Sequence, residues 1–111
     1  MGQLSSRLLN HTITILRPSA GPVDRLNRPT TIWKSAGQVR GEIQQVIGRQ
    51  VTNQLGETLI VDWLIILPAY TDVDFRYRLK KGAVTYEVQS VDRPMVRGEE
   101  HHVEVLARTV A

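Results

Sequence analysis

Three histidines are the side chains of this sequence best suited to bind a metal or to transfer protons: His11, His101 and His102. Histidine titrates near neutral pH and is the commonest metal ligand in proteins. His101 and His102 are adjacent, however, and adjacent residues of a strand face opposite sides of a sheet. We therefore expect that these two do not share one metal ion, unless the fold brings His11 close enough to complete a site. Otherwise all three are ordinary surface or strand histidines.

The other reactive groups lack the arrangement that catalysis requires. Glu99 and Glu100 lie at the end of a predicted loop, where solvated carboxylates are more typical than an acid–base pair. No serine lies in a nucleophile-elbow motif, and the segment GRQVTNQLG lacks the Lys-Ser/Thr ending of a phosphate-binding loop. The chain contains no cysteine, which removes thiol nucleophiles, disulfides and cysteine zinc sites. The sequence thus predicts that the protein is not an enzyme and holds no cofactor or metal.

A basic cluster in the segment FRYRLKK (residues 75–81) is a candidate nucleic-acid site, since single-strand binders combine cations with exposed aromatic rings. Alternation along a strand, however, sends Phe75 and Tyr77 to the face opposite Arg76 and Arg78. We interpret the aromatic residues as core and the cations as outer face. The net charge of +3 is a mild excess that fits a solvated basic surface. Eleven of the 14 basic residues are arginines, a bias that suits contacts with carboxylates or phosphates at an interface.

The elements that position these groups have the pattern of strands. Apolar and polar residues alternate in several segments, as expected for strands with one core face. Strands are predicted in HTITILRP (ended by Pro18), Ile32–Val46, Leu59–Leu67, the two arms of a hairpin that turns at KKG, and HHVEVLARTV. A short helix is predicted over Gln3–Leu9, and residues 18–31, with three prolines, are predicted to be a surface loop. The longest apolar run, Trp63–Leu67, is too short to cross a membrane, so no membrane partner is expected.

Six strand candidates, at most one short helix and no βαβ spacing predict an all-β fold. We expect a small antiparallel β-barrel, formed by a single domain over residues 1–111, with a two-sheet sandwich as the competing architecture. Gly41 lies on an inward face, which indicates a bend or a close approach of two backbones. The segment Leu59–Leu67 is apolar on both faces except at Asp62, which suggests that a partner covers its outer face.

Several motifs follow one another at consistent spacing: LNHTITILRP, Trp33, RGEIQQVIGRQ, YEVQSVDRP and HHVEVLAR. In this order they resemble the head-to-tail joining, or head-closure, proteins of long-tailed bacteriophages, over nearly the whole chain. Each motif alone is weakly specific, and their order, the chain length and the missing catalytic residues strengthen the resemblance. The chain departs from the family pattern at Ile47, where the family has Ser, and at Gln50, where it has Glu.

The resemblance implies a small β-barrel that assembles into a ring, expected to be dodecameric, in the phage neck. The ring would close the DNA channel between the portal and the tail and provide the surface to which the tail attaches. Its implied partners are further copies of the chain, the connector or adaptor protein on the portal, tail terminator or tail-tube proteins, and packaged DNA by steric contact. Its implied location is the neck of the virion, and the host cytoplasm during assembly.

The resemblance also places a long mobile loop between the second and third main strands. A single copy of such a loop offers little apolar surface against an ordering cost of about 1–2 kcal/mol per residue. In a ring, neighbouring copies can pair backbone to backbone around the pore. The alternative is a disordered surface loop without a gating role. The candidate channel-gating residues are Ile47, Gly48, Arg49, Gln50, Val51, Thr52, Asn53, Gln54, Leu55, Gly56 and Glu57.

Ring contacts between unlike surfaces need both signs of charge on the outward faces. The candidate ring-interface residues are Arg40, Glu42, Asp62, Arg76 and Arg78. The loops 18–31 and 92–100 are further candidates for contacts with neighbouring rings. The alternative function is a stand-alone nucleic-acid-binding small β-barrel, whose affinity for DNA would fall steeply with rising salt.

Overall fold

The computed structural model describes residues 10–52 and 55–110, and the secondary structure in this part of the chain is entirely β. The strands are β1 (His11–Ala20), β2 (Thr31–Thr52), β3 (Thr58–Pro68), β4 (Arg78–Lys81), β5 (Val84–Asp92), β6 (Met95–Val96), β7 (Glu99–Glu100) and β8 (His102–Thr109). The predicted all-β class is therefore confirmed. The helix predicted over residues 3–9 lies outside the described residues. The described part contains no helix of the length and apolar character that a bilayer span requires.

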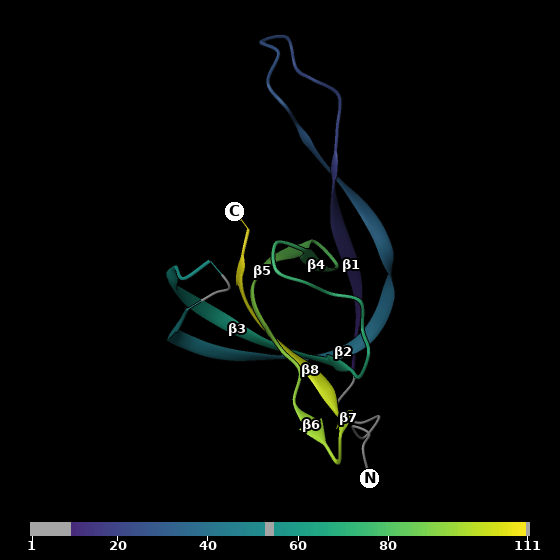
Figure 1. Ribbon diagram of the computed structural model, residues 1–111, viewed down its shortest axis with the longest axis vertical. Coiled ribbons are helices and arrows are strands. Elements are labelled where there is room, and N and C mark those ends of the chain that lie inside the picture. Colours follow the sequence, from purple (N-terminus) through teal and green to yellow (C-terminus); the bar gives the residue numbers. More distant parts are fainter. Residues whose placement is uncertain (1–9, 53–54, 111) are drawn as a thin grey trace.

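Six strands form one antiparallel sheet in the order β1-β2-β3-β8-β5-β4, and β4 pairs back onto β1 (Figure 1). The strand order therefore closes on itself, and we call this closed sheet the barrel. Within the described part of the chain, β6 and β7 pair only with each other and form a small hairpin between β5 and β8. The predicted number of about six antiparallel strands is confirmed.

The core is built from the inward-facing side chains of alternating residues. Ile13 and Ile15 of β1, Ile65 and Leu67 of β3, and Val105 of β8 are all essentially buried. Each fully buried aliphatic side chain of this kind contributes about 1.5–3 kcal/mol relative to an exposed one. The remaining members of the cluster are Val73, Leu79, Tyr86, Val88, Val103 and Ala107. The period-two pattern of the sequence therefore identified the core faces of β1 and β8 correctly.

Gly41 lies where β2 changes partner, since β2 pairs with β1 up to Gly41 and with β3 from Glu42 onward. A Cβ atom at this position would lie 2.8 Å from the Ile13 Cδ1 atom and 2.8 Å from the Ile66 carbonyl oxygen. Such distances are too short for van der Waals contact, so only glycine fits here. The predicted close backbone approach at Gly41 is confirmed.

The first two strands are longer than predicted. Pairing of β1 with β2 continues past Pro18 to Ala20, which lies opposite Thr31, so the predicted loop 18–31 is wrong at its start and the connection spans only residues 21–30. Pairing of β1 with β4 ends at Leu16. Beyond Leu16 no strand among the described residues pairs with this edge of β1, so Pro18, which has no N–H, is tolerated there.

This extension produces a two-stranded ribbon, residues 17–34, that we call the arm. Figure 1 shows the arm projecting from the barrel along the longest axis of the molecule, which measures 53 × 29 × 28 Å.

The strand predicted to begin at Phe75 begins at Arg78 instead. The Tyr77 N–H donates to the Asp74 carbonyl at 3.1 Å, and the Phe75 N–H donates to the Asp74 Oδ1 atom at 2.7 Å. These bonds form a turn in which Arg76 has a positive φ of 75°. The predicted alternation of Phe75 with Arg76 is therefore wrong, because Asp74 satisfies the backbone locally and the chain is not extended there.

Candidate functional site

The predicted channel-gating loop is for the most part a β-hairpin. Ile47–Thr52 belongs to β2, and Arg49, Gln50, Val51 and Thr52 pair with Val61, Ile60, Leu59 and Thr58 of β3. Among the described residues, the connection contains only Leu55, Gly56 and Glu57; Asn53 and Gln54 lie outside the described part. The prediction of a loop over residues 47–52 is wrong, because cross-strand pairing supplied partners that the weak local pattern did not indicate.

A bulge separates this hairpin from the barrel. Between Gln45 and Arg49 of β2 the register with β3 shifts, so that three residues of β2 lie opposite Asp62 alone. Gly48 takes a positive φ of 71°, and its N–H donates to the Asp62 Oδ1 atom at 3.3 Å. Bulges of this kind bend a strand and change the direction of its remaining residues. Asp62, predicted as a ring-interface residue, therefore lies at the base of the hairpin and contacts the bulge.

Beyond the bulge, the hairpin is a two-stranded ribbon. β3 pairs with β8 only from Trp63 onward, and β2 pairs with β1 only up to Gly41, so neither outer edge has a strand partner in the described residues. Ile60 is 59% exposed and Leu55 is 56% exposed. An isolated two-stranded ribbon is at best marginally stable. This segment therefore has unpaired strand edges and exposed apolar side chains together.

The five predicted ring-interface residues separate into two groups. Arg40 and Glu42 point outward on β2, and Asp62 lies on the adjacent strand β3, opposite the bulge and four residues from Ile66, the partner of Glu42. Arg76 lies in the turn before β4, and Arg78 is the first residue of β4, which pairs with β1 and β5 instead. The structure therefore does not bring all five together in one copy, as expected if they contribute to two different surfaces of a ring subunit.

Arg78 stacks on an aromatic ring rather than pointing freely to solvent. Its guanidinium carbon lies 4.2 Å from the centre of the Trp33 ring, a cation–π contact, and its Nε atom is buried without a hydrogen-bond partner among the described residues. Arg76 similarly lies 5.4 Å from the centre of the Phe75 ring. Both contacts border an open hollow of about 340 Å³ that also includes Leu55, Leu59, Glu57, Glu87, Val88, Gln89 and Arg108. The aromatic rings are thus engaged by the arginines, which the strict alternation of a strand did not predict.

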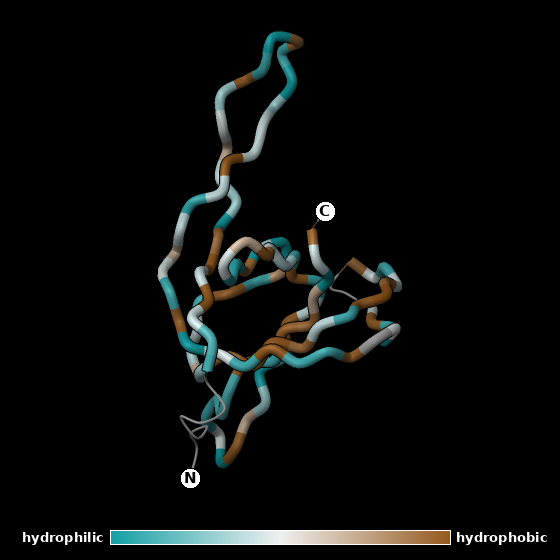
Figure 2. Tube along the Cα trace, turned by 180° about the vertical axis from the view of Figure 1, so that it is seen from behind, coloured by the Kyte–Doolittle hydropathy of each residue, from teal (hydrophilic) through white to brown (hydrophobic). Residues whose placement is uncertain are grey.

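The end of the arm is a well-ordered turn built around Asp24. The Asp24 Oδ1 atom accepts hydrogen bonds at 2.9 Å from the N–H groups of Leu26 and Arg28, and its Oδ2 atom accepts one at 2.9 Å from the Arg28 side chain. Asn27 takes a positive φ of 62°, a conformation that asparagine tolerates. Val23 and Leu26 are 59% and 71% exposed at this tip, and Figure 2 shows hydrophobic segments near the end of the arm. The turn thus holds two apolar side chains in solvent.

The order of this tip is expected to depend on pH. The hydrogen bond from the Arg28 N–H, with those from the Leu26 N–H and the Arg28 side chain, lowers the pKa of Asp24 from its usual value of 3.8. A lowered pKa in the folded state means that the bonds stabilise the tip above the unfolded pKa and are lost as pH falls through the folded one. Amide chemical shifts of Leu26 and Arg28 should therefore stay constant from pH 7 down to about 4 and change below. Asp24→Ala should give the low-pH shifts at pH 7, and unchanged shifts in that variant would contradict this role.

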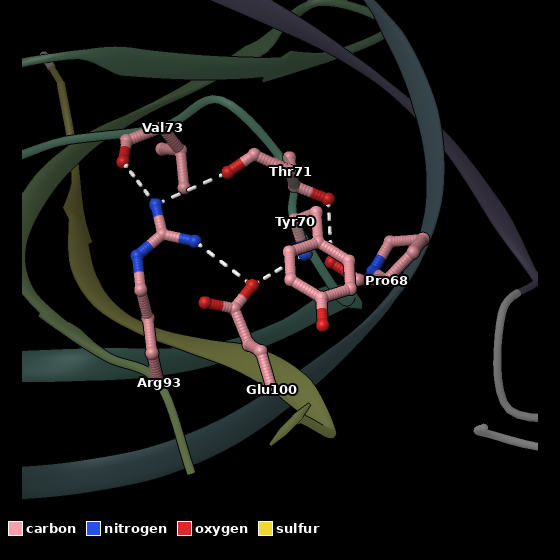
Figure 3. A network of polar contacts seen from close by, with 6 residues as sticks. All are labelled: Pro68, Tyr70, Thr71, Val73, Arg93 and Glu100. Atoms are coloured by element: carbon pink, nitrogen blue, oxygen red, sulfur yellow. Dashed lines mark hydrogen bonds and ion pairs between the residues drawn. The ribbon is translucent and has the colours of Figure 1, made fainter. Parts of the chain in front are cut away.

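A polar network that sequence analysis did not predict joins the β3–β4 loop to the β5–β8 connection (Figure 3). The Arg93 Nη1 atom lies 3.1 Å from the Glu100 Oε2 atom, and its Nη2 atom donates to the carbonyl oxygens of Thr71 at 3.1 Å and Val73 at 2.9 Å. The Tyr70 N–H also donates to the Glu100 Oε2 atom. Arg93 therefore fixes the loop that leads from β3 towards β4.

Arg93→Met is expected to lower the free energy of unfolding by about 2 kcal/mol, because it removes the hydrogen bonds that Arg93 donates to two carbonyls and one carboxylate. Denaturant unfolding measures the change. Arg97→Met is the matched control, since Arg97 is exposed on the β6–β7 turn and should change stability by no more than about 0.5 kcal/mol. Adding Glu100→Met to the Arg93 variant should recover part of the loss, and equal destabilisation by both single arginine variants would reject the network's role.

The histidines lie closer together than predicted. The Nδ1 atoms of His101 and His102 are 2.7 Å apart, and the His102 Nε2 atom lies 3.6 Å from the Glu104 Oε1 atom. The expectation that the two rings diverge is wrong because β7 ends at Glu100 and β8 begins at His102, so His101 is not in a strand. His11 contacts the Lys81 side chain instead. Within residues 10–52 and 55–110, no three His, Cys, Asp or Glu residues form a group that could hold a metal.

Comparison with known proteins relates this architecture to phage particles. The model of the phage head completion protein family matches residues 4–109. A chain from the virion of a native gene transfer agent particle is 18% identical with a TM-score of 0.60, over 92% of this chain and 96% of that one. Protein SF1141 from Shigella flexneri 2a is 17% identical with a TM-score of 0.63, over 93% of this chain and 94% of that one. No curated protein matches the chain.

At these identities the two solved structures support the fold alone, and the family match carries the assignment. The match covers nearly the whole chain, including the arm, the β2–β3 hairpin and the strands of the barrel. It confirms the resemblance inferred from the order of the sequence motifs, and it supports a structural role within the phage particle. This chain belongs to the phage head completion protein family.

Proposed function

We propose that this protein is a structural subunit of the phage neck that forms a ring between the portal-bound connector and the tail. The ring closes the DNA channel until the tail triggers release, and it provides the surface to which the tail attaches. Its partners are further copies of the chain, the connector protein, tail terminator or tail-tube proteins, and packaged DNA by steric contact. It is assembled in the host cytoplasm and remains in the virion.

The observation that carries this proposal is the β2–β3 hairpin beyond the Gly48 bulge. Arg49–Thr52 and Thr58–Val61 pair with each other, and within the described part of the chain no strand pairs with either outer edge. Exposed strand edges are templates for pairing with another chain. In a ring, the hairpins of successive copies come together around one axis and pair edge to edge. The paired backbones then obstruct the channel, and the obstruction does not depend on charged side chains. The closure is therefore steric.

The bulge explains how such a closure can reopen. The hairpin meets the barrel where Gly48 has a positive φ and where its N–H bonds to the Asp62 side chain. A hinge is typically a few residues that absorb a large change in backbone angles. Rotation at the bulge moves the hairpin without disturbing the core pairs that begin at Gln45 and Trp63. Tail attachment would then shift the ring from the closed to the open arrangement.

Electron microscopy of purified particles tests this proposal. We expect a ring of these barrels at the head–tail junction, with the β2–β3 hairpins directed into the central channel before DNA release and withdrawn after it. Particles from which the chain is absent would reject a place in the neck. Hairpins directed outward in the filled particle would reject the gating role while leaving the ring intact.

A further inference from the structure

The outer part of the arm lies away from the barrel (Figure 1). Its tip is closed by the hydrogen bonds of the Asp24 turn, and at its base the Arg17 Nη2 atom lies 3.0 Å from the Asp72 Oδ2 atom in an exposed ion pair. It carries two apolar side chains, Val23 and Leu26, that are largely exposed to solvent. A rigid apolar tip loses little conformational entropy on binding, which is the property of a pre-organised binding element.

The arm also has a strong charge. It carries four cations against the single carboxylate of Asp24: Arg17, Arg25, Arg28 and Lys34. Its net charge of +3 equals that of the whole chain, so the remainder of the protein is neutral in sum. The surface that receives the arm should therefore combine apolar side chains with an excess of carboxylates.

The barrel has such a surface on the outer face of β3 and β8. Ile65, Leu67 and Val105 are buried, so their sequence neighbours Ile66, Leu64 and Leu106 point outward. Leu64 lies opposite Leu106, and Ile66 lies opposite Glu104. All three outward apolar side chains remain partly exposed.

Carboxylates border this apolar surface on both sides. In one row across the sheet, Glu42 of β2 lies opposite Ile66, Ile66 opposite Glu104, and Glu104 opposite Asp92 of β5. Arg40 also points outward on β2, two residues from Glu42, so the excess is two negative charges. We call Glu42, Leu64, Ile66, Asp92, Glu104 and Leu106 together the β3–β8 outer face.

We infer that the arm of one copy binds the β3–β8 outer face of a neighbouring copy. Val23 and Leu26 contact Leu64, Ile66 and Leu106, while the arm cations face the three carboxylates. The inference rests on the proposed ring only in requiring that copies be adjacent. It also accounts for the apolar outer residues of β3, which the sequence indicated to be covered by a partner.

The geometry of the two surfaces fits a ring. The arm and the β3–β8 outer face are different surfaces of one molecule, so the contact is heterologous, and repeated heterologous contacts generate rings or open filaments. From Arg17 to the tip the ribbon is about 25 Å long at roughly 3.3 Å per residue. That length matches the 28–29 Å width of the molecule, so an arm can lie across most of a neighbour.

Site-specific cross-linking in purified particles tests the contact. The chain has no cysteine, so Leu26→Cys with Ile66→Cys introduces the only thiols of this protein. A short bis-maleimide should convert the chain into a ladder of covalent multimers, whereas Leu26→Cys alone should give none. Leu26→Cys with Val84→Cys, which is exposed at the start of β5, is the matched control and should also give none. If the chain is in the particle and both thiols are modified without a ladder, the contact is wrong although the proposed neck location stands.

A charge exchange keeps the test decisive if the cysteine variants fail to assemble. Arg25→Glu and Glu104→Arg should each abolish incorporation of the chain into particles while leaving its circular dichroism spectrum unchanged. The double variant, and also a mixture of the two single variants, should restore incorporation. In both cases position 25 of one copy can again meet a residue of opposite charge at position 104 of a neighbouring copy. Incorporation at the normal level by either single variant, or no recovery in the double variant, would overturn the inference.

Discussion

Gly41→Ala is expected to lower the free energy of unfolding by about 3 kcal/mol, at the upper end of the cost of overpacking a core. The added Cβ atom would lie 2.8 Å from the Ile66 carbonyl oxygen and 2.9 Å from the Leu67 Cδ2 atom. The Leu67 side chain can rotate away, but the carbonyl belongs to β3, which pairs with β2 from the next residue onward. The barrel can therefore accommodate the methyl group only by separating two strands.

Denaturant unfolding followed by circular dichroism measures this effect, with a melting temperature about 10–15 °C below wild type as the thermal equivalent. Gly82→Ala is the control, because Gly82 has a positive φ of 59° but open space around its Cα atom. It should cost only the roughly 1–2 kcal/mol of a left-handed backbone. Gly41→Val should be worse than Gly41→Ala. Equal stability of the Gly41→Ala and wild-type proteins would show that β2 and β3 are less closely packed at this corner than their geometry indicates.

The sequence predicted the strands in which apolar and polar residues alternate regularly. Ile13 and Ile15, or Val103 and Val105, alternate with polar neighbours because one face of each strand is buried, and periodicity reports burial directly. The glycine at position 41 could be recognised because it interrupts an inward-facing apolar series. The hairpin turn was placed at KKG in the same way, and Gly82 has a positive φ in the turn between β4 and β5.

The elements that were mispredicted depend on partners distant in the sequence. A proline usually ends a strand. Pro18 does not, because no described strand pairs with that edge of β1 beyond Leu16, and only the strand order reveals this. Ile47–Thr52 has no pattern of its own and is a strand because Thr58–Val61 lies opposite. Polarity alone did not distinguish a ribbon exposed on both faces from a loop, since both lack a buried face.

The candidate site was only partly predictable for a related reason. The residues proposed for gating lie in one continuous segment, and the sequence did not predict that part of this segment is a strand. Arg93 and Glu100 form their network across a connection, and nothing in the spacing of the two residues marks them as partners. The separation of Arg40 and Glu42 from Arg76 and Arg78 depends on how the barrel closes, which sequence patterns do not specify.

Shortening the β2–β3 hairpin is expected to release packaged DNA without unfolding the barrel. In this variant residues 51–59 are removed, and the paired residues Gln50 and Ile60 are joined through Asn-Gly, a favoured two-residue turn. The described residues of the removed part are exposed or half-buried and include two cross-strand pairs, each of which contributes about 0.2–1 kcal/mol. The melting temperature should therefore change little.

Particles carrying the shortened hairpin should contain the normal amount of this protein but lose their DNA, because the edges that pair around the channel are gone. DNase sensitivity and the fraction of empty heads measure the loss. A matched deletion shortens the arm instead, with residues 22–29 replaced by Asn-Gly between Gly21 and Thr30, whose N–H and carbonyl are already bonded at 2.9 Å. That variant should be missing from particles altogether, since the arm serves assembly and not closure. DNA retention at the wild-type level in particles that contain the shortened hairpin would remove the gating role, and the hairpin would then have to serve contact with another neck protein.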